Sequence, residues 1–232
     1  MNVRATKVKF CGITRPEDAE LAVSLGAWAI GMILWPGSKR AIDPARAAEV
    51  AGAVRRRAEI AGVFVNPALD ELTATAEAVG LTLIQLHGQE GPAFCAEVAR
   101  RTGCRLIKAA RVRTGADIQA LASFHTDFHL LDSFVPGALG GTGETFSWEL
   151  AREAGRRRGK PPAVPLILSG GLHAGNVAEA IRTVSPYAVD VASGTELTPG
   201  RKDPDKMHAF AEAVAAAGAA AGAAAGAAAI QA

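Results

Sequence analysis

Two side chains suited to proton transfer end short segments that lie far apart in the sequence. Cys11 closes a segment in which Val8 and Phe10 alternate with polar residues, and Asp132 follows the run Phe-His-Leu-Leu. An acid and a base that face each other across a bound substrate can move protons without any cofactor. Lysines near Cys11 and a helix start just after it favour the thiolate form. A packed core cysteine and a capping aspartate are the structural alternatives at these two positions.

Three glycine-rich turns indicate a second kind of chemistry, the binding of an anion. They fall at residues 140–143, 170–171 and 193–194. Glycine lets backbone N–H groups approach a phosphate closely, and the N-terminus of a following helix adds a favourable dipole. Each turn alone is equally compatible with a plain connection between elements, whereas the three together favour a phosphate site.

The elements that would position these residues alternate regularly between strand and helix. Strands are expected at residues 7–11, 27–34, 60–65, 81–86, 105–109, 128–131, 164–168 and 188–191. Helices are expected at residues 16–24, 44–57, 69–79, 92–101, 116–122, 147–158 and 176–184, with a last helix opening at Asp203-Pro204. Eight such pairs in a chain this short predict an α/β protein with a single closed (β/α)₈ barrel, the TIM barrel. An open doubly wound sheet is the competitor, but no Gly-x-Gly-x-x-Gly follows the first strand.

In such a barrel the carboxyl ends of the strands line one mouth, and phosphate commonly binds at the loops after strands seven and eight. Further polar residues at strand ends are Lys9, Arg40, Asn66, Gln85, His87, Lys108, Ser169 and Asp190. The histidines and the three cysteines show no metal-ligand spacing, so we expect neither a metal nor a cofactor.

Bulk composition narrows the function classes. The 232 residues carry 25 basic and 23 acidic side chains, a balance that gives no signal for nucleic acid or a membrane surface. A hydrophobic content of 49% supports one large catalytic domain over residues 1–214. Residues 215–232 form an Ala/Gly-rich tail without chemistry, expected to extend the last helix. Because no signal peptide or membrane span is evident, a cytoplasmic location is expected.

Seven motifs, in order along the chain from about residue 7 to residue 212, resemble the phosphoribosylanthranilate isomerase family. They are Lys9-Phe10-Cys11-Gly12-Ile13-Thr14, Trp35-Pro36-Gly37-Ser38-Lys39-Arg40, Gln85-Leu86-His87-Gly88, Leu131-Asp132, Gly140-Gly141-Thr142-Gly143, Ser169-Gly170-Gly171-Leu172 with Asn176, and Val189-Asp190-Val191-Ala192-Ser193-Gly194-Thr195-Glu196. Any one motif is weak evidence, but seven in register are strong.

The resemblance implies an Amadori rearrangement in tryptophan biosynthesis, on a small phosphosugar substrate and with no cofactor. Asp132 would protonate the furanose ring oxygen as general acid, and Cys11 would remove the C2′ proton as general base. Arg40 would pair with the anthranilate carboxylate. The other substrate-binding residues that it implies are Gln85, His87, Gly141, Gly143, Gly170, Gly171, Ser193 and Gly194, most of them around the phosphate. Monomer and homodimer both remain open.

Four alternative functions were considered. Indole-glycerol-phosphate synthase would need a catalytic lysine and glutamate pattern that the sequence does not show. The related isomerase of histidine biosynthesis uses two aspartates, which Cys11 at the first strand argues against. A lysine Schiff-base aldolase would use Lys9 or Lys108 as nucleophile. A non-catalytic module that binds a phosphorylated ligand would have no need for both Cys11 and Asp132.

Overall fold

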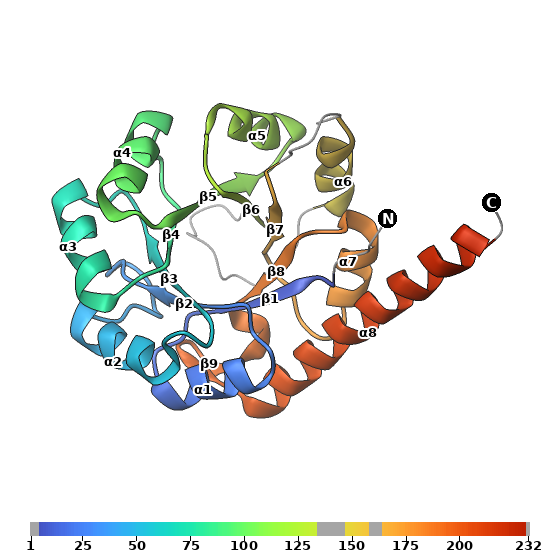
Figure 1. Ribbon diagram of the computed structural model, residues 1–232, viewed down its shortest axis with the longest axis horizontal. Helices are drawn as coiled ribbons and strands as arrows, with labels where there is room; N and C mark the ends of the chain where they lie inside the picture. The colour runs from blue at the N-terminus through green and yellow to red at the C-terminus, as the bar shows by residue number, and fades with distance from the viewer. Residues whose placement is uncertain (1–4, 134–146, 158–163, 231–232) are drawn as a thin grey trace.

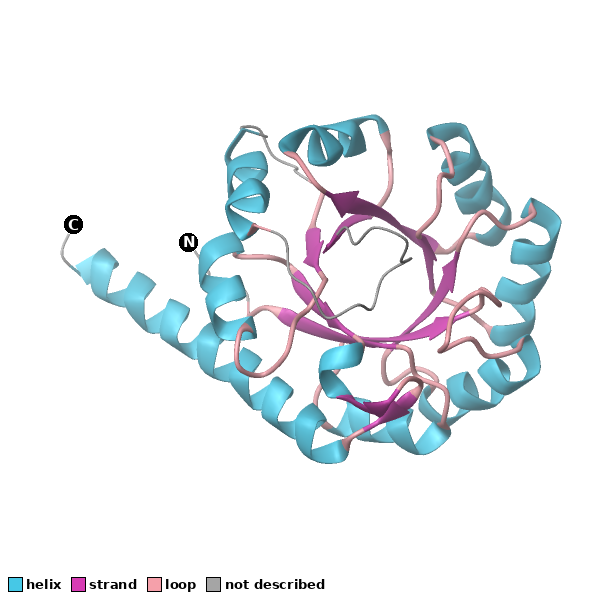
Figure 2. Ribbon diagram, turned by 180° about the vertical axis from the view of Figure 1, so that it is seen from behind, coloured by secondary structure: helices cyan, strands magenta, loops and turns pink. Residues whose placement is uncertain are grey.

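The protein is a closed barrel of eight parallel strands, β1 to β8 in sequence order, surrounded by helices (Figures 1 and 2). The computed structural model describes residues 5–133, 147–157 and 164–230, with side chains omitted at 153–157 and 220–230. The strands are β1 (Lys7–Cys11), β2 (Ala29–Ile33), β3 (Glu59–Phe64), β4 (Leu83–Leu86), β5 (Arg105–Val112), β6 (Phe128–Ser133), β7 (Leu166–Leu168) and β8 (Ala188–Val191). The predicted (β/α)₈ barrel is confirmed.

The helices pack around the outside of the strands. They are α1 (Pro16–Ser24), α2 (Pro44–Val54), α3 (Leu69–Val79), α4 (Pro92–Thr102), α5 (Gly115–Ala120) followed by the short 3₁₀ turn η1 (Leu121–Ser123), α6 (Trp148–Arg157), α7 (Val177–Val184) and α8 (Pro204–Ile230). Proline at the first turn of α1, α2 and α4 suits a position whose N–H has no helical partner. Asp43 caps α2 by accepting from the Arg46 backbone N–H at 2.8 Å.

Two apolar layers account for the near-continuous hydrophobic runs of the strands. One fills the space between barrel and helices and includes Phe10, Ile30 and Ile84. The other fills the barrel interior and includes Ala29, Leu83 and Phe128. Because successive side chains of a strand point to opposite faces, a strand covered on both sides is apolar at every position.

A small hairpin after β8 was absent from the sequence-based assignment. Ser193–Thr195 forms a 3₁₀ turn, η2, and then β9 (Glu196–Thr198) pairs antiparallel with β10 (Arg201–Lys202). Strands of two or three residues are too short to show a period, so the pattern of the sequence gives no sign of them. This hairpin brings two buried charges, Glu196 and Lys202, to the barrel mouth.

The last helix continues through the Ala/Gly-rich tail as far as Ile230. Met207, Phe210, Val214 and Ala217 are buried, a spacing of three and four that forms one apolar stripe. The Phe210 ring lies 6.1 Å from that of Phe10 in an edge-to-face arrangement. The packed part of the helix therefore reaches Ala217, slightly beyond the expected domain end at residue 214.

Candidate active site

The two candidate proton-transfer residues lie on the inner face of the barrel near its carboxyl end. Leu83, Leu130 and Ala188 belong to the interior apolar layer. Two residues further along the same strands stand Gln85, Asp132 and Asp190, which therefore also face inward. Polar groups thus replace the apolar interior where the strands end, as expected for the catalytic end of this fold.

One pocket at this mouth brings together five residues that the sequence singled out. Cys11, Arg40, Gln85, His87 and Asp132 all line it. Apolar side chains complete the wall, at Ile33, Trp35, Val63 and Val65. An acid, a thiol and a guanidinium therefore share one concave, partly apolar site, the usual form of a small-molecule site.

The environment of Cys11 differs from the sequence-based expectation. Cys11 is only 5% exposed, and burial raises the pKa of its thiol above the ordinary value although Lys9 and Lys202 act in the opposite direction. Desolvation disfavours the thiolate more than the two ammonium groups favour it. Lys9 thus favours the thiolate as the sequence analysis expected, but burial, which that analysis did not include, outweighs it.

Asp132 is buried beside His87. The imidazole Nε2 lies 3.3 Å from Asp132 Oδ2, and the other carboxylate oxygen accepts from the Ser133 backbone N–H at 2.9 Å. The side chain of Gln85 lies with its Nε2 2.9 Å from His87 Nδ1. If Gln85 donates there, the ring proton is on Nε2 and faces the carboxylate.

Arg40 is held by a partner that the sequence analysis did not assign. Its Nε and Nη2 donate to the two carboxylate oxygens of Glu196, each at 2.7 Å. This hydrogen-bonded pair is the largest factor that raises the pKa of Arg40 above its ordinary value. Nη1 takes no part in this pair.

A second, smaller pocket adjoins the first and shares Asp132 with it. It is lined also by Ser169, Gly170, Gly171 and Ser193, the turns after β7 and β8. Gly170 and Gly171 have φ of +89° and +62°, a region that residues with a Cβ rarely adopt. A Cβ at Gly194 would lie 2.0 Å from the Leu172 carbonyl oxygen. Gly141 and Gly143, also expected here, lie outside the described residues.

Two further ion pairs are buried near the mouth. Lys9 Nζ lies 2.7 Å from Asp190 Oδ1, and Lys108 Nζ lies 2.7 Å from Glu90 Oε2. Lys202 donates to the Ala192 carbonyl at 2.9 Å, and burial lowers the pKa of Lys202 to about 8. The sequence placed Lys9, Lys108 and Asp190 at strand ends. No pattern in the sequence predicts which of these charged residues pair with each other or with Glu90.

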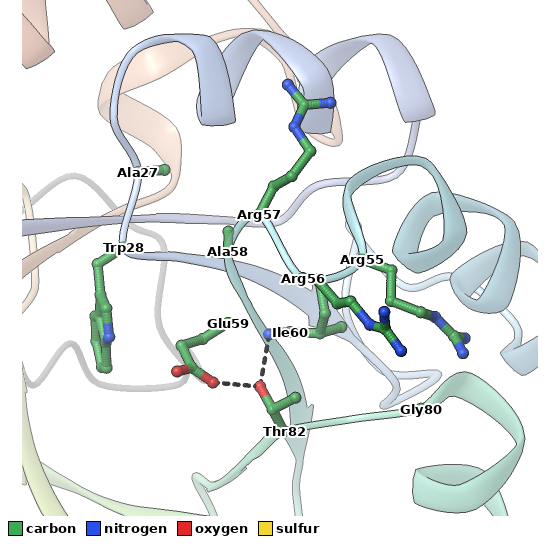
Figure 3. Close-up of a pocket in the computed structure, with 10 residues that line it drawn as sticks. All are labelled: Ala27, Trp28, Arg55, Arg56, Arg57, Ala58, Glu59, Ile60, Gly80 and Thr82. Atoms are coloured by element: carbon green, nitrogen blue, oxygen red, sulfur yellow. Dashed lines mark hydrogen bonds between the residues drawn. The ribbon is translucent and has the colours of Figure 1, made fainter.

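A much larger cavity lies at the opposite end of the barrel (Figure 3). Its volume is about 690 Å³, and it is lined by residues at or just before the N-terminal ends of β2, β3 and β4, among them Trp28, Glu59 and Thr82. Glu59 accepts from the Thr82 hydroxyl at 2.6 Å. The arginines of residues 55–57 directly follow the end of α2 at Val54 and line this cavity. Its location, at the amino ends of the strands, makes this cavity part of the barrel's structural end.

The described part of the chain forms neither a metal-binding cluster nor a membrane-spanning helix. There, no set of three or more His, Cys, Asp or Glu side chains is arranged to hold a metal ion. Nor does any helix within the described ranges combine the length and apolarity that a membrane span requires.

Comparison with known proteins gives a consistent result. The sequence model of the family described as "PRAI: N-(5'phosphoribosyl)anthranilate (PRA) isomerase" matches residues 8–213. The N-(5'-phosphoribosyl)anthranilate isomerase of Citrifermentans bemidjiense is 46% identical over 202 residues, which cover 87% of this chain and 93% of that protein.

Solved structures agree. The crystal structure of phosphoribosyl anthranilate isomerase from Thermotoga maritima superposes with a TM-score of 0.81 at 38% identity, covering 91% of this chain and 99% of that one. A structure of the isomerase in complex with reduced 1-(o-carboxyphenylamino)-1-deoxyribulose 5-phosphate gives a TM-score of 0.78 at 36% identity, with the same coverage.

These matches span the barrel from β1 to α8 and include the strands that carry Cys11 and Asp132. The aldolase, the two-aspartate isomerase and the non-catalytic module are thereby excluded as the function of this barrel. The chain belongs to the phosphoribosylanthranilate isomerase family, the enzymes that convert N-(5'-phosphoribosyl)anthranilate to 1-(2-carboxyphenylamino)-1-deoxyribulose 5-phosphate in tryptophan biosynthesis.

Proposed function

We propose that Asp132 is the general acid and Cys11 the general base of this isomerisation. Asp132 donates a proton to the furanose ring oxygen, the C1′–O bond breaks, and the anthranilate nitrogen supplies the electron pair that forms an iminium. The Cys11 thiolate then removes the proton from C2′ and leaves an enolamine, which tautomerises to the ketone. The observation that carries the proposal is that both side chains line the same pocket.

The proton-transfer task assigned to Cys11 and to Asp132 is compatible with the chemistry of the substrate and with the neighbouring side chains. The iminium acidifies the C2′–H bond, so a thiolate of modest basicity is sufficient. Asp132 lies 3.3 Å from His87 Nε2, so a polar ring nitrogen stands beside the carboxyl group that we propose donates the proton. Asp132 supplies the proton of the first step and Cys11 accepts the proton of the second, so the steps as proposed are proton transfers between substrate and protein side chains.

Substrate binding divides between the two adjoining pockets. We assign the anthranilate carboxylate to Arg40, because a guanidinium matches a carboxylate in shape and charge. Gln85 and His87 line the same pocket and are assigned to the sugar. The phosphate is assigned to Gly170, Gly171, Ser193 and Gly194, where glycine turns follow β7 and β8. Gly141 and Gly143 are proposed to complete this phosphate site.

The wider assignments are also proposals. The catalytic unit is residues 1–214, the tail of residues 215–232 takes no part in chemistry, and the enzyme works in the cytoplasm. The Thermotoga maritima relative is dimeric. Analytical ultracentrifugation at enzyme concentrations of the assay distinguishes monomer from homodimer for this chain.

The acid–base assignment is tested by Cys11→Ser and Asp132→Asn in a fluorescence assay of substrate made in situ. Each variant should lose activity by about 10² or more while keeping the circular dichroism spectrum and melting temperature of the parent. Matched controls are Cys104→Ser, a half-buried thiol outside the pocket, and Asp70→Asn, an exposed carboxylate on α3. Near-normal activity in either active-site variant contradicts its role.

A further inference from the structure

We propose that Asp190 holds the buried Lys9 ammonium group close to Cys11, and that the positive charge of Lys9 favours the thiolate form of Cys11. The proposal deepens the proposed function, because it rests on Cys11 as the base. Lys9 keeps its proton throughout: the C2′ proton goes to the Cys11 sulfur, and Lys9 only stabilises the charge that this sulfur carries beforehand. Lys9 is thus a positioning residue and no proton donor.

Lys9 is fixed from two directions. It is 0% exposed, and its Nζ lies 2.7 Å from Asp190 Oδ1. Lys9 and Asp190 are register partners on the paired strands β1 and β8, so the backbone itself holds them side by side. The second oxygen of Asp190 accepts from the Ser169 hydroxyl at 3.1 Å. The carboxylate therefore has both oxygens engaged, and the ammonium has little freedom to swing away.

The Lys9 ammonium and the Cys11 thiol both lie next to Gly31. Gly31 on β2 is the register partner of Cys11. A Cβ placed on Gly31 would lie 2.9 Å from Cys11 Sγ and 2.9 Å from Lys9 Nζ, so these two atoms are at most about 6 Å apart. Opposite charges at that distance in a buried site favour each other's charged form. The missing side chain at position 31 leaves the room in which the two groups approach.

The Lys9–Asp190 pair opposes the effect of burial on Cys11. Burial raises the pKa of the Cys11 thiol, and the carboxylate of Asp190 acts in the same direction, whereas Lys9 is the strongest opposing group and Lys202 assists it. Arg40, from the loop after β2, is a further cation whose interaction with Cys11 is favourable. Asp132 and His87 line the same pocket across from the thiol. A base at this position needs a nearby fixed cation.

Asp190 is required because a buried lysine left alone gives up its proton. Burial is the largest effect on Lys9 and lowers its pKa, but Asp190 and Cys11 together outweigh burial, and the pKa of Lys9 is raised overall. Asp190 thus weakens the thiolate slightly by its own charge yet secures the ammonium that favours it. Removing either member of the pair should have the same sign of effect on Cys11.

The test measures the titration of Cys11 without substrate. In a Cys95→Ala/Cys104→Ala background, Cys11 is the sole remaining thiol of the chain, and its thiolate absorbs near 240 nm. Lys9→Met should move the pH at which the thiolate forms upward by about one unit or more, and Asp190→Asn should do likewise. The rate of iodoacetamide labelling against pH should shift in parallel.

Lys108→Met is the matched control. Lys108 is another buried lysine paired with a carboxylate, Glu90, at the same 2.7 Å, but it sits on β5 and its charge is not among those that act on Cys11. Its removal should leave the Cys11 titration in place. Ser169→Ala, which loosens Asp190 without removing a charge, should give a smaller upward shift and serves if Lys9→Met fails to fold.

The outcomes separate this inference from the proposed function. An unchanged Cys11 titration in folded Lys9→Met and Ser169→Ala overturns the positioning role, whatever the activity. A shifted titration together with full activity of Cys11→Ser leaves the positioning role standing and removes Cys11 from the role of base. A shift of equal size in Lys108→Met shows a general loss of interior charge and also overturns the inference.

Discussion

Arg40 and Glu196, which lie 156 residues apart in the sequence, form a two-pronged ion pair with both N–O distances at 2.7 Å. Both side chains are largely buried, at 11% and 4% exposure. Gly12 packs against the pair so closely that a Cβ there would lie 2.8 Å from Arg40 Cδ. The orientation of the guanidinium is therefore set by the hairpin β9–β10 and by the turn after β1.

Glu196→Gln should raise KM for the substrate by about 10-fold with a smaller change in kcat, because the guanidinium loses a charge-assisted pair that orients it. Steady-state assays of this variant, of Arg40→Ala and of the double variant measure the coupling. The KM effect of Glu196→Gln should vanish once Arg40 is removed. An equal rise in KM in the Arg40→Ala background would show that Glu196 acts on another part of the site. Glu179→Gln, an exposed position on α7, is the control and should leave KM unchanged.

Gly194→Ala should damage the phosphate site and the fold together. The new Cβ would meet the Leu172 carbonyl oxygen at 2.0 Å, and because that atom belongs to the backbone, the turn itself must move. We expect a melting temperature several degrees lower and a KM raised by about 10-fold. Gly52→Ala is the matched control: it lies inside α2 with open space around it and should leave stability equal or slightly higher. A Gly194→Ala enzyme with parental KM would refute the phosphate assignment at this turn.

Lys202 should make stability depend on alkaline pH. Burial lowers the pKa of Lys202 to about 8 in the folded protein, against an ordinary value of 10.5. Between these two values the unfolded chain binds a proton that the folded chain does not, so this group makes folding more favourable as pH rises through the window. Relative to Lys202→Met, the free energy of unfolding of the parent should rise by on the order of 3 kcal/mol from pH 7.5 to 10.5. The free energies of unfolding are measured by urea denaturation at each pH. If they change with pH in the same way in the parent and in Lys202→Met, the environment assigned to Lys202 is contradicted.

Truncation locates the end of the structural domain. Val214 and Ala217 are the last described side chains that are buried against the core. A chain that ends after Gly218 should keep the melting temperature and activity of the full chain. A chain that ends after Phe210 loses both buried contacts and should melt several degrees lower. If the chain that ends after Gly218 is already destabilised, the residues beyond Gly218 also contribute to the fold.

The order of elements could be predicted from the sequence because each strand is an apolar run bounded by turn residues. Period-two alternation placed Cys11 at the end of the first strand, and an apolar run placed Asp132 after the sixth. The barrel topology brings the two residues to one mouth. The hairpin that carries Glu196 and Lys202 could not be predicted, because two or three residues show no period. The Arg40–Glu196 contact spans most of the chain and follows only from three-dimensional packing.

Charge near Cys11 was visible in the sequence, but the net effect of the surroundings on the pKa of the thiol was not. Lys9 and Lys202 favour the thiolate, whereas the depth of burial, which no local pattern reveals, raises the pKa of the thiol. Balances between desolvation and Coulomb attraction depend on atomic distances in the folded protein. The sequence therefore located the residues that we propose react, but it did not predict how burial affects the ionisation of Cys11.

The most direct test of the mechanism is a single-turnover measurement with substrate deuterated at C2′. Cys11→Ser slows the removal of that proton, so its isotope effect should equal or exceed that of the parent. Asp132→Asn slows ring opening, a step that breaks no C–H bond, so the isotope effect should fall towards one. This opposite response of the two variants is what the assignment of base to Cys11 and acid to Asp132 predicts. A collapsed isotope effect in Cys11→Ser, or a full one in Asp132→Asn, would contradict it.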